Sequence, residues 1–372
     1  MVCSVLAHSI APTLVIRGTE VWPRALQEIA RLGSRPLLLG RSAVTLPLRR
    51  DLLAKLQGAG LTPQLAELRH DCCLEDLARL QQQAEQSLPN GPCDSVIAMG
   101  GGKVLDAGKL LAHRLGTPCI TVPTSAATCA GWSALSNLYT PAGAFLEDVS
   151  LDRCPDLLVF DHGLVKQAPP QTLVSGMADA MAKWYEASVS SAQSTDGLVQ
   201  QAVQQARLLR DQILLDGVAA FQDPGSDAWV RVAEGSALTA GLIGGLGGAR
   251  CRTVAAHAVH NGLTQLPATH SRLHGEKVGF GILVQLRLEE VLGGSRLAGH
   301  ARNQLLAFFR TLGVPSELSD LGLAQASLQE LQQVCDHACR EGSDLHRLPF
   351  PVDVQDLLAA LVSTTTQTLP VG

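Results

Sequence analysis

The stretch SVIAMGGGKVLDAGK, residues 95–109, decides the fold of this chain. Its first six residues form a short apolar run typical of a buried strand; the run ends in Gly100, and Gly101 and Gly102 follow directly. The residues after the glycines have the apolar spacing of a helix. Glycines let the backbone approach a phosphate closely, and a helix that begins there points its free N–H groups at the anion. The stretch therefore predicts a strand, a tight turn and a helix that can together hold a pyrophosphate.

The glycine spacing leaves a second interpretation open. It is not GxGxxG, so it lacks the usual dinucleotide fingerprint, and a plain tight turn between strand and helix would look the same. In that case Asp106 and Lys109 are ordinary helix residues. On the first interpretation the three glycines and Asp106 are candidate cofactor-binding residues.

Similar short apolar runs recur on both sides of this stretch. They alternate with helical segments at 23–33 and 74–88, a pattern that predicts a parallel sheet covered by helices on both faces. Ligands of such sheets bind at the carboxyl ends of the strands. The N-terminal segment is expected to enter as a further strand, and 141–155 to form a small hairpin. The predicted strands are 36–40, 95–100, 119–124 and 156–161.

The chain changes character after Pro169 and Pro170. Strand-like runs almost vanish, and long amphipathic stretches follow, which predicts an all-helical second half. We therefore expect an α/β dinucleotide-binding domain over 1–165 and a helical, metal-binding domain over 166–372. The predicted helices are 171–192, 196–221, 226–246, 253–264, 276–291, 297–312, 325–341 and 353–367.

Composition narrows the class of protein. The chain has 372 residues, enough for two cores, and a net charge of -5. It contains no long basic run, which argues against a nucleic-acid partner or an anionic membrane surface. The ten cysteines are scattered and typical of reduced thiols. With no apolar run of membrane-spanning length and no basic leader, we expect a soluble cytoplasmic protein without a membrane partner.

Three residues in the second half suggest a metal site. Asp179 lies in GMADAMAKWYEA, His257 in VAAHAVHNGLT and His274 in RLHGEKV. One carboxylate oxygen and two imidazole nitrogens can hold a divalent metal with a position left open, which is the catalytic pattern. The same set also fits Fe(II), so it does not choose the metal. A metal that polarises an alcohol oxygen beside a dinucleotide indicates hydride transfer.

Each of these residues also has an ordinary explanation. Asp179 could form a salt bridge with Lys183, one helical turn away. His257 and His260 lie three residues apart on one helix face, and either could be a buried, hydrogen-bonded core histidine. His274 could belong to a surface turn or a helix cap. Taken together with the glycine turn, the three favour the metal site.

The end of the strand PLLLG, residues 36–40, bears on the choice of nucleotide. NAD sites usually place an acid there to bind the ribose 2′-hydroxyl, but here Arg41 and Ser42 follow. A cation suits the 2′-phosphate of NADP. A solvated arginine is the alternative, so both NADP and NAD remain candidate cofactors.

The chain resembles a known family, the glycerol dehydrogenase-like branch of the iron-containing alcohol dehydrogenases. The resemblance covers nearly the whole chain. It implies the dehydroquinate synthase-like architecture, with an N-terminal dinucleotide-binding domain, a C-terminal helical domain and an active site in the cleft between them. The motifs that carry it are GGGKVLDAGK, PTSAATCAGWSALSNLYT, GMADAMAKWYEA, AAHAVHNGLT and LHGEKVGFGILVQ.

The resemblance also implies roles for individual residues. Asp179, His257 and His274 correspond to the metal ligands, and His260 to a histidine near the substrate. Many iron enzymes of the wider family have a histidine ligand where this chain has Lys183, which leaves three protein ligands, as in the zinc-using glycerol dehydrogenases. Zinc is therefore favoured over iron. The residues that correspond to the dinucleotide site are Gly102, Lys103, Thr124, Ser133, Leu135 and Tyr139.

One departure concerns the substrate. Glycerol dehydrogenases carry an aspartate where this chain has Cys129, and a thiol accepts polyol hydroxyls poorly. The segment ATCAGW, which includes Trp132, is similar to 2-hydroxycarboxylate dehydrogenases of this branch, which are associated with NADPH-linked reduction of 2-oxo acids. We therefore expect a small 2-oxo acid as substrate, with His260 and Cys129 as candidate catalytic residues.

Three other functions stay open. The first is a dehydrogenase of glycerol or another vicinal diol, and the second a dehydroquinate synthase-like lyase, which shares the architecture. The third is a degenerate binding protein, which the intact metal trio disfavours. Homo-oligomers are common in the family, so a second copy of the chain is a candidate partner.

Overall fold

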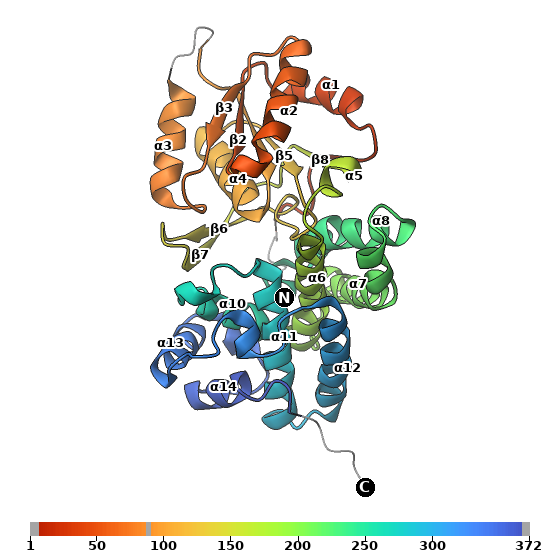
Figure 1. The fold of residues 1–372 in the computed structure, drawn as a ribbon, viewed down its shortest axis with the longest axis vertical. Coiled ribbons are helices and arrows are strands. Elements are labelled where there is room, and N and C mark those ends of the chain that lie inside the picture. The colour runs from red at the N-terminus through yellow and green to blue at the C-terminus, as the bar shows by residue number, and fades with distance from the viewer. Residues whose placement is uncertain (1–6, 87–90, 367–372) are drawn as a thin grey trace, which may run out of the picture. The chain divides into compact units, whose positions relative to one another are not determined.

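The structure is a computed structural model that describes residues 7–86 and 91–366. By its contacts the chain divides into two compact units, which we describe separately (Figure 1). Unit 1 comprises Met1–Ala142 and Leu146–Ala168. Unit 2 comprises Gly143–Phe145 and Pro169–Gly372.

Unit 1 is built on a six-stranded sheet in which every pair of neighbours is parallel. The predicted parallel α/β sheet is therefore confirmed, and the four predicted strands are β2, β8, β5 and β4 to within one residue. Every residue of these four is buried, as expected for strands covered on both faces. Across the sheet the order is β1 (Leu14–Gly18), β8 (Leu157–Asp161), β5 (Cys119–Pro123), β4 (Ser95–Gly100), β2 (Pro36–Gly40) and β3 (Gln64–Glu67).

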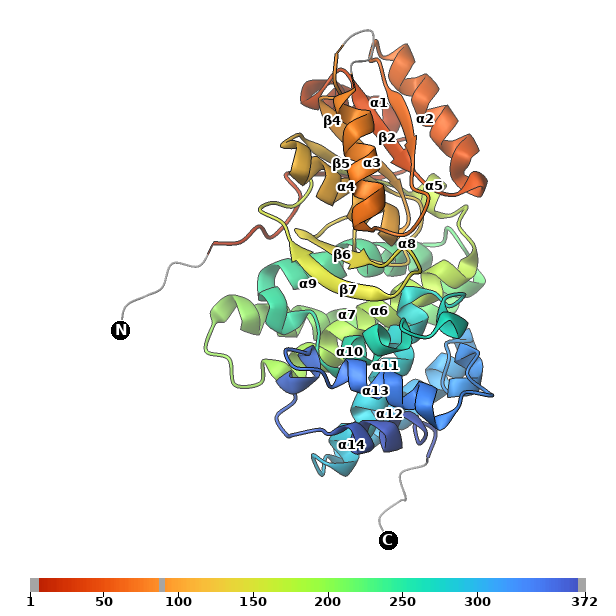
Figure 2. The same ribbon diagram turned by 90° about the vertical axis from the view of Figure 1, so that its left-hand side faces the viewer.

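Helices cover both faces of this sheet (Figure 2). Helices α1 (Trp22–Leu32) and α2 (Leu46–Gly58) share a core with Leu38 and Ile97 on one face. Helices α3 (Leu74–Glu85) and α4 (Gly102–Leu115) lie on the other. A short helix α5 (His162–Val165) follows β8, and its Leu164 packs into the core that α1 and α2 share. Gly108 lets helix α4 lie close to β4, since a Cβ at this position would be 2.3 Å from the Cβ of Ala98.

A two-stranded sheet of β6 (Leu135–Tyr139) and β7 (Phe145–Ser150) follows β5. The hairpin predicted at 141–155 was therefore placed six residues too late. Pro141 and Gly143, with which the predicted range begins, lie in the turn between the two strands, where Gly143 has a φ of 94°. The tip of this hairpin belongs to unit 2, where the Phe145 N–H donates to Thr264 Oγ1 at 3.0 Å.

Unit 2 is helical, as predicted. The expected helix over 226–246 contains a π-helical turn, Gly235–Thr239, between α8 and α9, which amphipathic periodicity does not distinguish from α-helix. The last expected helix was too long, since α14 ends at Leu361; residue 367 lies outside the described residues. The helices are α6 (Pro170–Ser190), α7 (Gly197–Gln222), α8 (Asp227–Glu234), α9 (Ala240–Gly247), α10 (Ala255–Leu263), α11 (His274–Val291), α12 (Arg296–Leu312), α13 (Leu328–Ala338) and α14 (Val354–Leu361).

Two glycines on α11 bring three helices of unit 2 together. A Cβ at Gly275 would lie 1.8 Å from the carbonyl oxygen of Ser175 on α6. A Cβ at Gly281 would lie 2.3 Å from the carbonyl oxygen of Ala256 on α10. Helix α11 can therefore touch the backbones of α6 and α10, which carry the other two candidate metal ligands.

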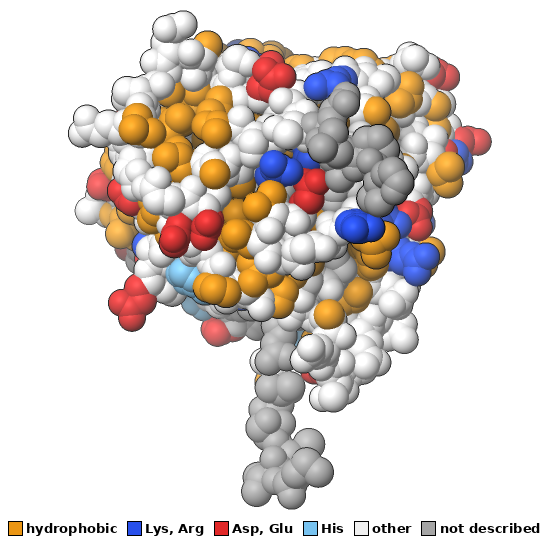
Figure 3. All heavy atoms as spheres, turned by 90° about the horizontal axis from the view of Figure 1, so that it is seen from below, with side chains coloured by type: hydrophobic (Ala, Val, Ile, Leu, Met, Phe, Trp, Pro, Cys, Tyr) orange, Lys and Arg blue, Asp and Glu red, His pale blue; other side chains and the backbone are white. Residues whose placement is uncertain are grey.

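The surface carries mixed side chains. On the face shown in Figure 3, hydrophobic side chains are interspersed with acidic and basic ones. Exposed hydrophobic residues such as Leu297, Leu328 and Val362 are ordinary on a protein surface. Among the described residues, no helix combines the length and the apolar character that a membrane crossing requires.

Candidate metal and dinucleotide sites

The structure brings Asp179, His257 and His274 together within unit 2. Asp179 Oδ1 lies 3.5 Å from Nε2 of each histidine, and all three ligand atoms lie within 4.8 Å of one another. Asp179 and His257 are buried in the middle of α6 and near the start of α10, while His274 is partly exposed as the first residue of α11. Helix α11 begins at His274 because the Glu276 carboxylate accepts the Leu273 N–H at 2.7 Å.

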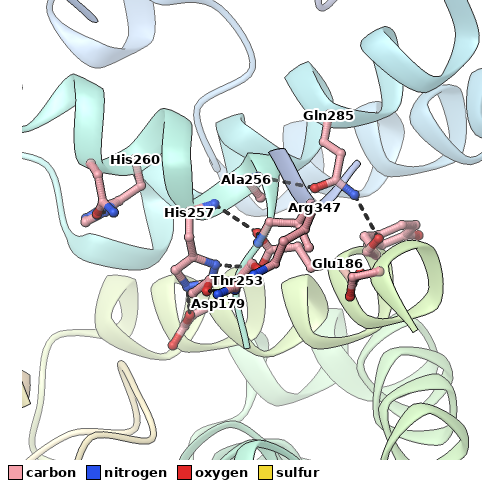
Figure 4. A network of polar contacts seen from close by, with 12 residues as sticks. Asp179, Glu186, Thr253, Ala256, His257, His260, Gln285 and Arg347 are labelled. Carbon is pink, nitrogen blue, oxygen red and sulfur yellow. Dashed lines mark hydrogen bonds and ion pairs between the residues drawn. The ribbon is translucent and has the colours of Figure 1, made fainter. Parts of the chain in front are cut away.

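A buried carboxylate orients His257 (Figure 4). His257 Nδ1 lies 2.6 Å from Glu186 Oε2, and its Nε2 faces Asp179. Such a carboxylate partner fixes the ring and its tautomer, leaving the other nitrogen available to a metal. Glu186 Oε1 also accepts the N–H groups of Val254 and His257 at 2.6 and 3.0 Å, so the same side chain secures the start of α10.

Gln285 on α11 completes this support. Its Oε1 accepts the Ala256 N–H at 3.2 Å, and its Nε2 donates to the Tyr185 carbonyl at 2.8 Å. It thereby joins α11, α10 and α6 around the trio. Our sequence analysis missed both Glu186 and Gln285. Helical spacing could have indicated them, since Glu186 lies two turns after Asp179 and Gln285 three turns after His274.

The charges of the site act strongly on one another. Burial alone would raise the pKa of Asp179, but the Lys183 charge and the two neighbouring histidines hold that pKa well below its usual range. Burial alone would lower the pKa of His257, but the charge of Glu186 and the contacts with both carboxylates raise it to about 9. In the metal-free protein the carboxylates therefore favour a protonated His257, and a metal would take the place of that proton.

The trio fits a divalent metal. Asp179 Oδ1 is buried and has no hydrogen-bond partner among the described residues, which is costly for a carboxylate unless a cation satisfies it. The donor set of one oxygen and two nitrogens suits Zn²⁺ or Fe²⁺. Among the described residues, this is the group of histidines, cysteines and acids whose ligand atoms all lie within 4.8 Å of one another.

His260 lies beside the trio. Its ring centroid is 4.2 Å from that of His274, and it is 2% exposed. Its Nδ1 lies 2.9 Å from Asn261 Oδ1. Burial, followed by the charges of His274 and Lys277, holds the pKa of His260 well below its usual range, which favours the neutral imidazole.

The predicted glycine turn lies in unit 1 at the carboxyl end of β4. Gly100 ends the strand, Gly101 precedes α4, and Gly102 is the first residue of that helix. No side chain caps α4, and a Cβ at Gly101 would meet nothing within 4 Å. A Cβ at Gly102, by contrast, would lie 2.9 Å from Thr128 Cγ2. The backbone N–H groups at the start of α4 are therefore not capped by a side chain, and the space beside Gly101 is open. Both features suit a pyrophosphate.

The segment after β5 is held against α4 by a buried pair, Asp106 and Lys109. Lys109 Nζ lies 3.1 Å from Asp106 Oδ1 and donates to the carbonyl oxygens of Ser133 and Leu135. The Asp106 carboxylate therefore faces Lys109, a positioning role that sequence analysis did not assign to either residue. Thr124, directly after β5, donates its N–H to the Gly100 carbonyl at 3.1 Å, next to the glycine turn.

Four further predicted residues, Arg41, Lys103, Cys129 and Tyr139, also lie in unit 1. Arg41 forms an ion pair with Asp71, a residue that sequence analysis missed, and the ring of Tyr139 lies 5.1 Å from Lys103 Nζ. Cys129 is partly buried between β5 and β6, where its carbonyl accepts the Trp132 N–H at 2.9 Å. The candidate nucleotide contacts and Cys129 are therefore in unit 1, and the metal trio and His260 are in unit 2.

Comparison with known sequences gives a consistent set of relatives. A family model described as iron-containing alcohol dehydrogenase matches residues 12–162. An uncharacterized oxidoreductase of Synechocystis is 51% identical, over 97% of this chain and 92% of the relative. A glycerol dehydrogenase of Escherichia coli O6:H1 is 32% identical over 95% of both chains. Hydroxycarboxylate dehydrogenase A of Escherichia coli K12 is 36% identical over 71% of this chain and 73% of that protein.

Solved structures give the same architecture. The crystal structure of a probable glycerol dehydrogenase from Sinorhizobium meliloti superposes with a TM-score of 0.82 at 29% identity, covering 96% of this chain and 98% of that one. Its similarity to this chain therefore extends over both units.

Proposed function

Because the chain belongs to the iron-containing alcohol dehydrogenase family of oxidoreductases, we propose that it interconverts 2-oxo acids and 2-hydroxy acids with a divalent metal and NAD(P). The buried Asp179 Oδ1, which lies 3.5 Å from Nε2 of both His257 and His274, carries the metal part of this proposal. The uncapped glycine turn before α4 carries the nucleotide part. We propose zinc as the metal and NADP as the preferred nucleotide.

Different side chains would bind the metal, orient its ligands and transfer the proton. Asp179, His257 and His274 hold the metal, and Glu186 keeps His257 Nε2 turned toward it. Held by these residues, a divalent metal would supply Lewis-acid chemistry toward a substrate oxygen, and a bound nicotinamide would supply hydride chemistry. His260, whose pKa favours the neutral form, moves a proton to or from the alcohol oxygen.

The charge around the trio favours an anionic substrate. Two buried lysines, Lys183 and Lys277, offset all but one negative charge of the three buried carboxylates, Asp179, Glu186 and Glu276. A divalent cation then leaves the site with net positive charge, which attracts a substrate carboxylate. Cys129 supports the same choice, since it replaces the aspartate that the resemblance associates with polyol binding.

Lys183 gives a direct test of this charge argument. Changing Lys183→Met removes one buried positive charge while keeping much of the side-chain volume. We expect kcat/KM for 2-oxobutanoate to fall about tenfold or more, because a carboxylate loses an attractive charge in a partly buried site. Turnover of the neutral ketone 2-butanone should change much less. Equal losses with both substrates would contradict a role for this charge in substrate choice.

Glycerol is the second candidate substrate, because curated relatives of similar identity carry that name. Zinc-loaded protein should be assayed with NADPH or NADH and 2-oxobutanoate or 2-oxoglutarate, and with NAD and glycerol. Our proposal predicts turnover of the 2-oxo acids with NADPH. Turnover restricted to glycerol and NAD would instead assign the chain to the diol dehydrogenases and remove Cys129 from the substrate argument.

A further inference from the structure

Three neighbouring strands of unit 1 are followed by charged residues at the same edge of the sheet. Arg41 follows β2 directly, Asp71 lies in the segment between β3 and α3, and Lys103 follows the glycine turn after β4. Strands β4, β2 and β3 are adjacent and parallel, so their carboxyl ends meet at one edge. The sequence alone does not show that Asp71 lies near Arg41 and Lys103, because it is about thirty residues from either cation.

Asp71 joins the two cations. Its Oδ1 accepts a hydrogen bond from Arg41 Nη1 and its Oδ2 accepts one from Lys103 Nζ, so each oxygen of this buried carboxylate holds one cation. The side chains of Arg41 and Lys103 nevertheless remain 41% and 44% exposed. Each cation therefore has one side on Asp71 and another side open to a ligand.

The turn that carries Arg41 is firmly supported. Arg49, which is 1% exposed, donates through Nη2 to the Ser42 carbonyl at 2.9 Å and to Glu67 Oε1 at 3.1 Å. Gly40 makes room for it, since a Cβ there would lie 2.1 Å from Arg49 Cδ. Arg41 thus extends from a fixed backbone rather than from a loose loop.

The position of this cluster relates it to the nucleotide of the proposed function. Strands β2 and β4 are neighbours, and the helices that follow them, α2 and α4, cover opposite faces of the sheet (Figure 2). Doubly wound sheets bind dinucleotides at such a point, with the pyrophosphate at the glycine turn and the adenosine ribose beyond the adjacent strand. Arg41 and Lys103 would then face the 2′ position of that ribose.

We infer that Asp71 sets how strongly this chain prefers NADP to NAD, an inference that rests on the proposed dinucleotide site. Two cations alone would strongly favour the dianionic 2′-phosphate. The carboxylate between them cancels one positive charge and offers an acceptor for a ribose hydroxyl, as the acid of an NAD site does. Asp71 therefore weakens the discrimination that Arg41 and Lys103 create and leaves NAD usable.

The test compares two adenosine probes that need neither metal nor turnover. The dissociation constants of 2′,5′-ADP and 5′-AMP are measured by calorimetry on the full chain and on Asp71→Asn. We expect the preference for 2′,5′-ADP over 5′-AMP to rise about tenfold in Asp71→Asn, because one negative charge near a dianion is removed. The control is Asp51→Asn, which removes the same charge from an exposed position on α2 and should leave the ratio unchanged.

A second variant covers the case in which Asp71→Asn does not fold. Arg41→Ala alters a partly exposed side chain, and it should lower the preference for 2′,5′-ADP about tenfold because one cation is lost. An unchanged ratio in folded Asp71→Asn, or in Arg41→Ala when the first variant does not fold, would overturn the inference while the dinucleotide site stands. Failure of the unmodified protein to bind either probe would overturn the dinucleotide site itself, and the inference with it.

Discussion

Among the residues that are not proposed metal ligands, Glu186 should have the largest effect on zinc affinity. Changing Glu186→Gln keeps the shape but removes the charge that orients and polarises His257. We expect zinc affinity to fall about 10–100-fold, the usual effect of losing a carboxylate behind a histidine ligand. Competition with a chelator of known affinity measures this. Glu341→Gln, an exposed change in unit 2, is the control; equal affinity in both variants would contradict the role of Glu186.

Glu289 should make stability depend on pH. Burial raises the pKa of Glu289 to about 7, only partly offset by its hydrogen bond from Gln285. Between pH 4.5 and 7 the unfolded chain loses a proton that the folded protein keeps, so stability falls as pH rises through this range. Glu289→Gln removes the penalty, and we expect it to stabilise the protein by about 1–3 kcal/mol above pH 7.

Urea denaturation at two pH values checks this prediction. The gain of Glu289→Gln should be present at pH 8 and absent near pH 4, where the glutamate is protonated in both states. A gain of equal size at both pH values would show that packing, and not the charge, separates the two proteins.

Residue identity alone indicated only part of the site. Asp179, His257 and His274 stood out because each lies in a characteristic segment, and the structure does bring them together. Asp71 could not be found this way, because its partners follow two other strands, β2 and β4, and only the strand order makes them neighbours. Lys109 looked like an ordinary helix residue, since nothing in the sequence shows that it reaches the carbonyls of Ser133 and Leu135.

At the scale of the elements, the close approach of α11 to α6 should be essential for the metal site. In Gly275→Ala the new methyl group would meet the Ser175 carbonyl, so the start of α11, which carries His274, must move. We expect a loss of about 1–3 kcal/mol of stability, as for an overpacked core, and weaker zinc binding. Thermal unfolding and zinc titration measure the two effects.

The matched control is Gly58→Ala. Gly58 is the last residue of α2, and a Cβ there would meet nothing within 4 Å. This change should be neutral or stabilising by up to about 1 kcal/mol, because alanine favours helix. If Gly275→Ala behaved like Gly58→Ala, the close contact would have no bearing on the position of His274.

The elements themselves were largely predictable, for a physical reason. Strands buried on both faces read as continuous apolar runs, so β2, β4, β5 and β8 were visible in the sequence. Strand β3, with the sequence QLAE at one edge of the sheet, has one buried residue and gives no such signal. The hairpin of β6 and β7 was misplaced because both strands contain many polar residues, so their composition resembles that of the turn between them.

At the scale of the whole molecule, the two candidate sites should be separable. Asp179→Ala removes a proposed metal ligand from unit 2 but touches no residue proposed for the nucleotide in unit 1. Zinc at a hundred times its dissociation constant should stabilise the unmodified protein by about 2.7 kcal/mol and the variant not at all. Binding of 2′,5′-ADP should stay within about twofold, since independent sites behave additively. Loss of nucleotide binding in a folded Asp179→Ala protein would contradict this separation.

The assignment of Gly143–Phe145 to unit 2 bears on how the chain is made. All the strands of the large sheet have left the ribosome once Asp161 has emerged. The partner of the Phe145 N–H, Thr264, lies 119 residues further along. At typical synthesis rates this is a delay of roughly 6 to 24 seconds, during which the hairpin tip has no finished structure to join. The nascent protein therefore passes through a stage in which every strand of the large sheet has been synthesised while the partner of that tip has yet to be translated.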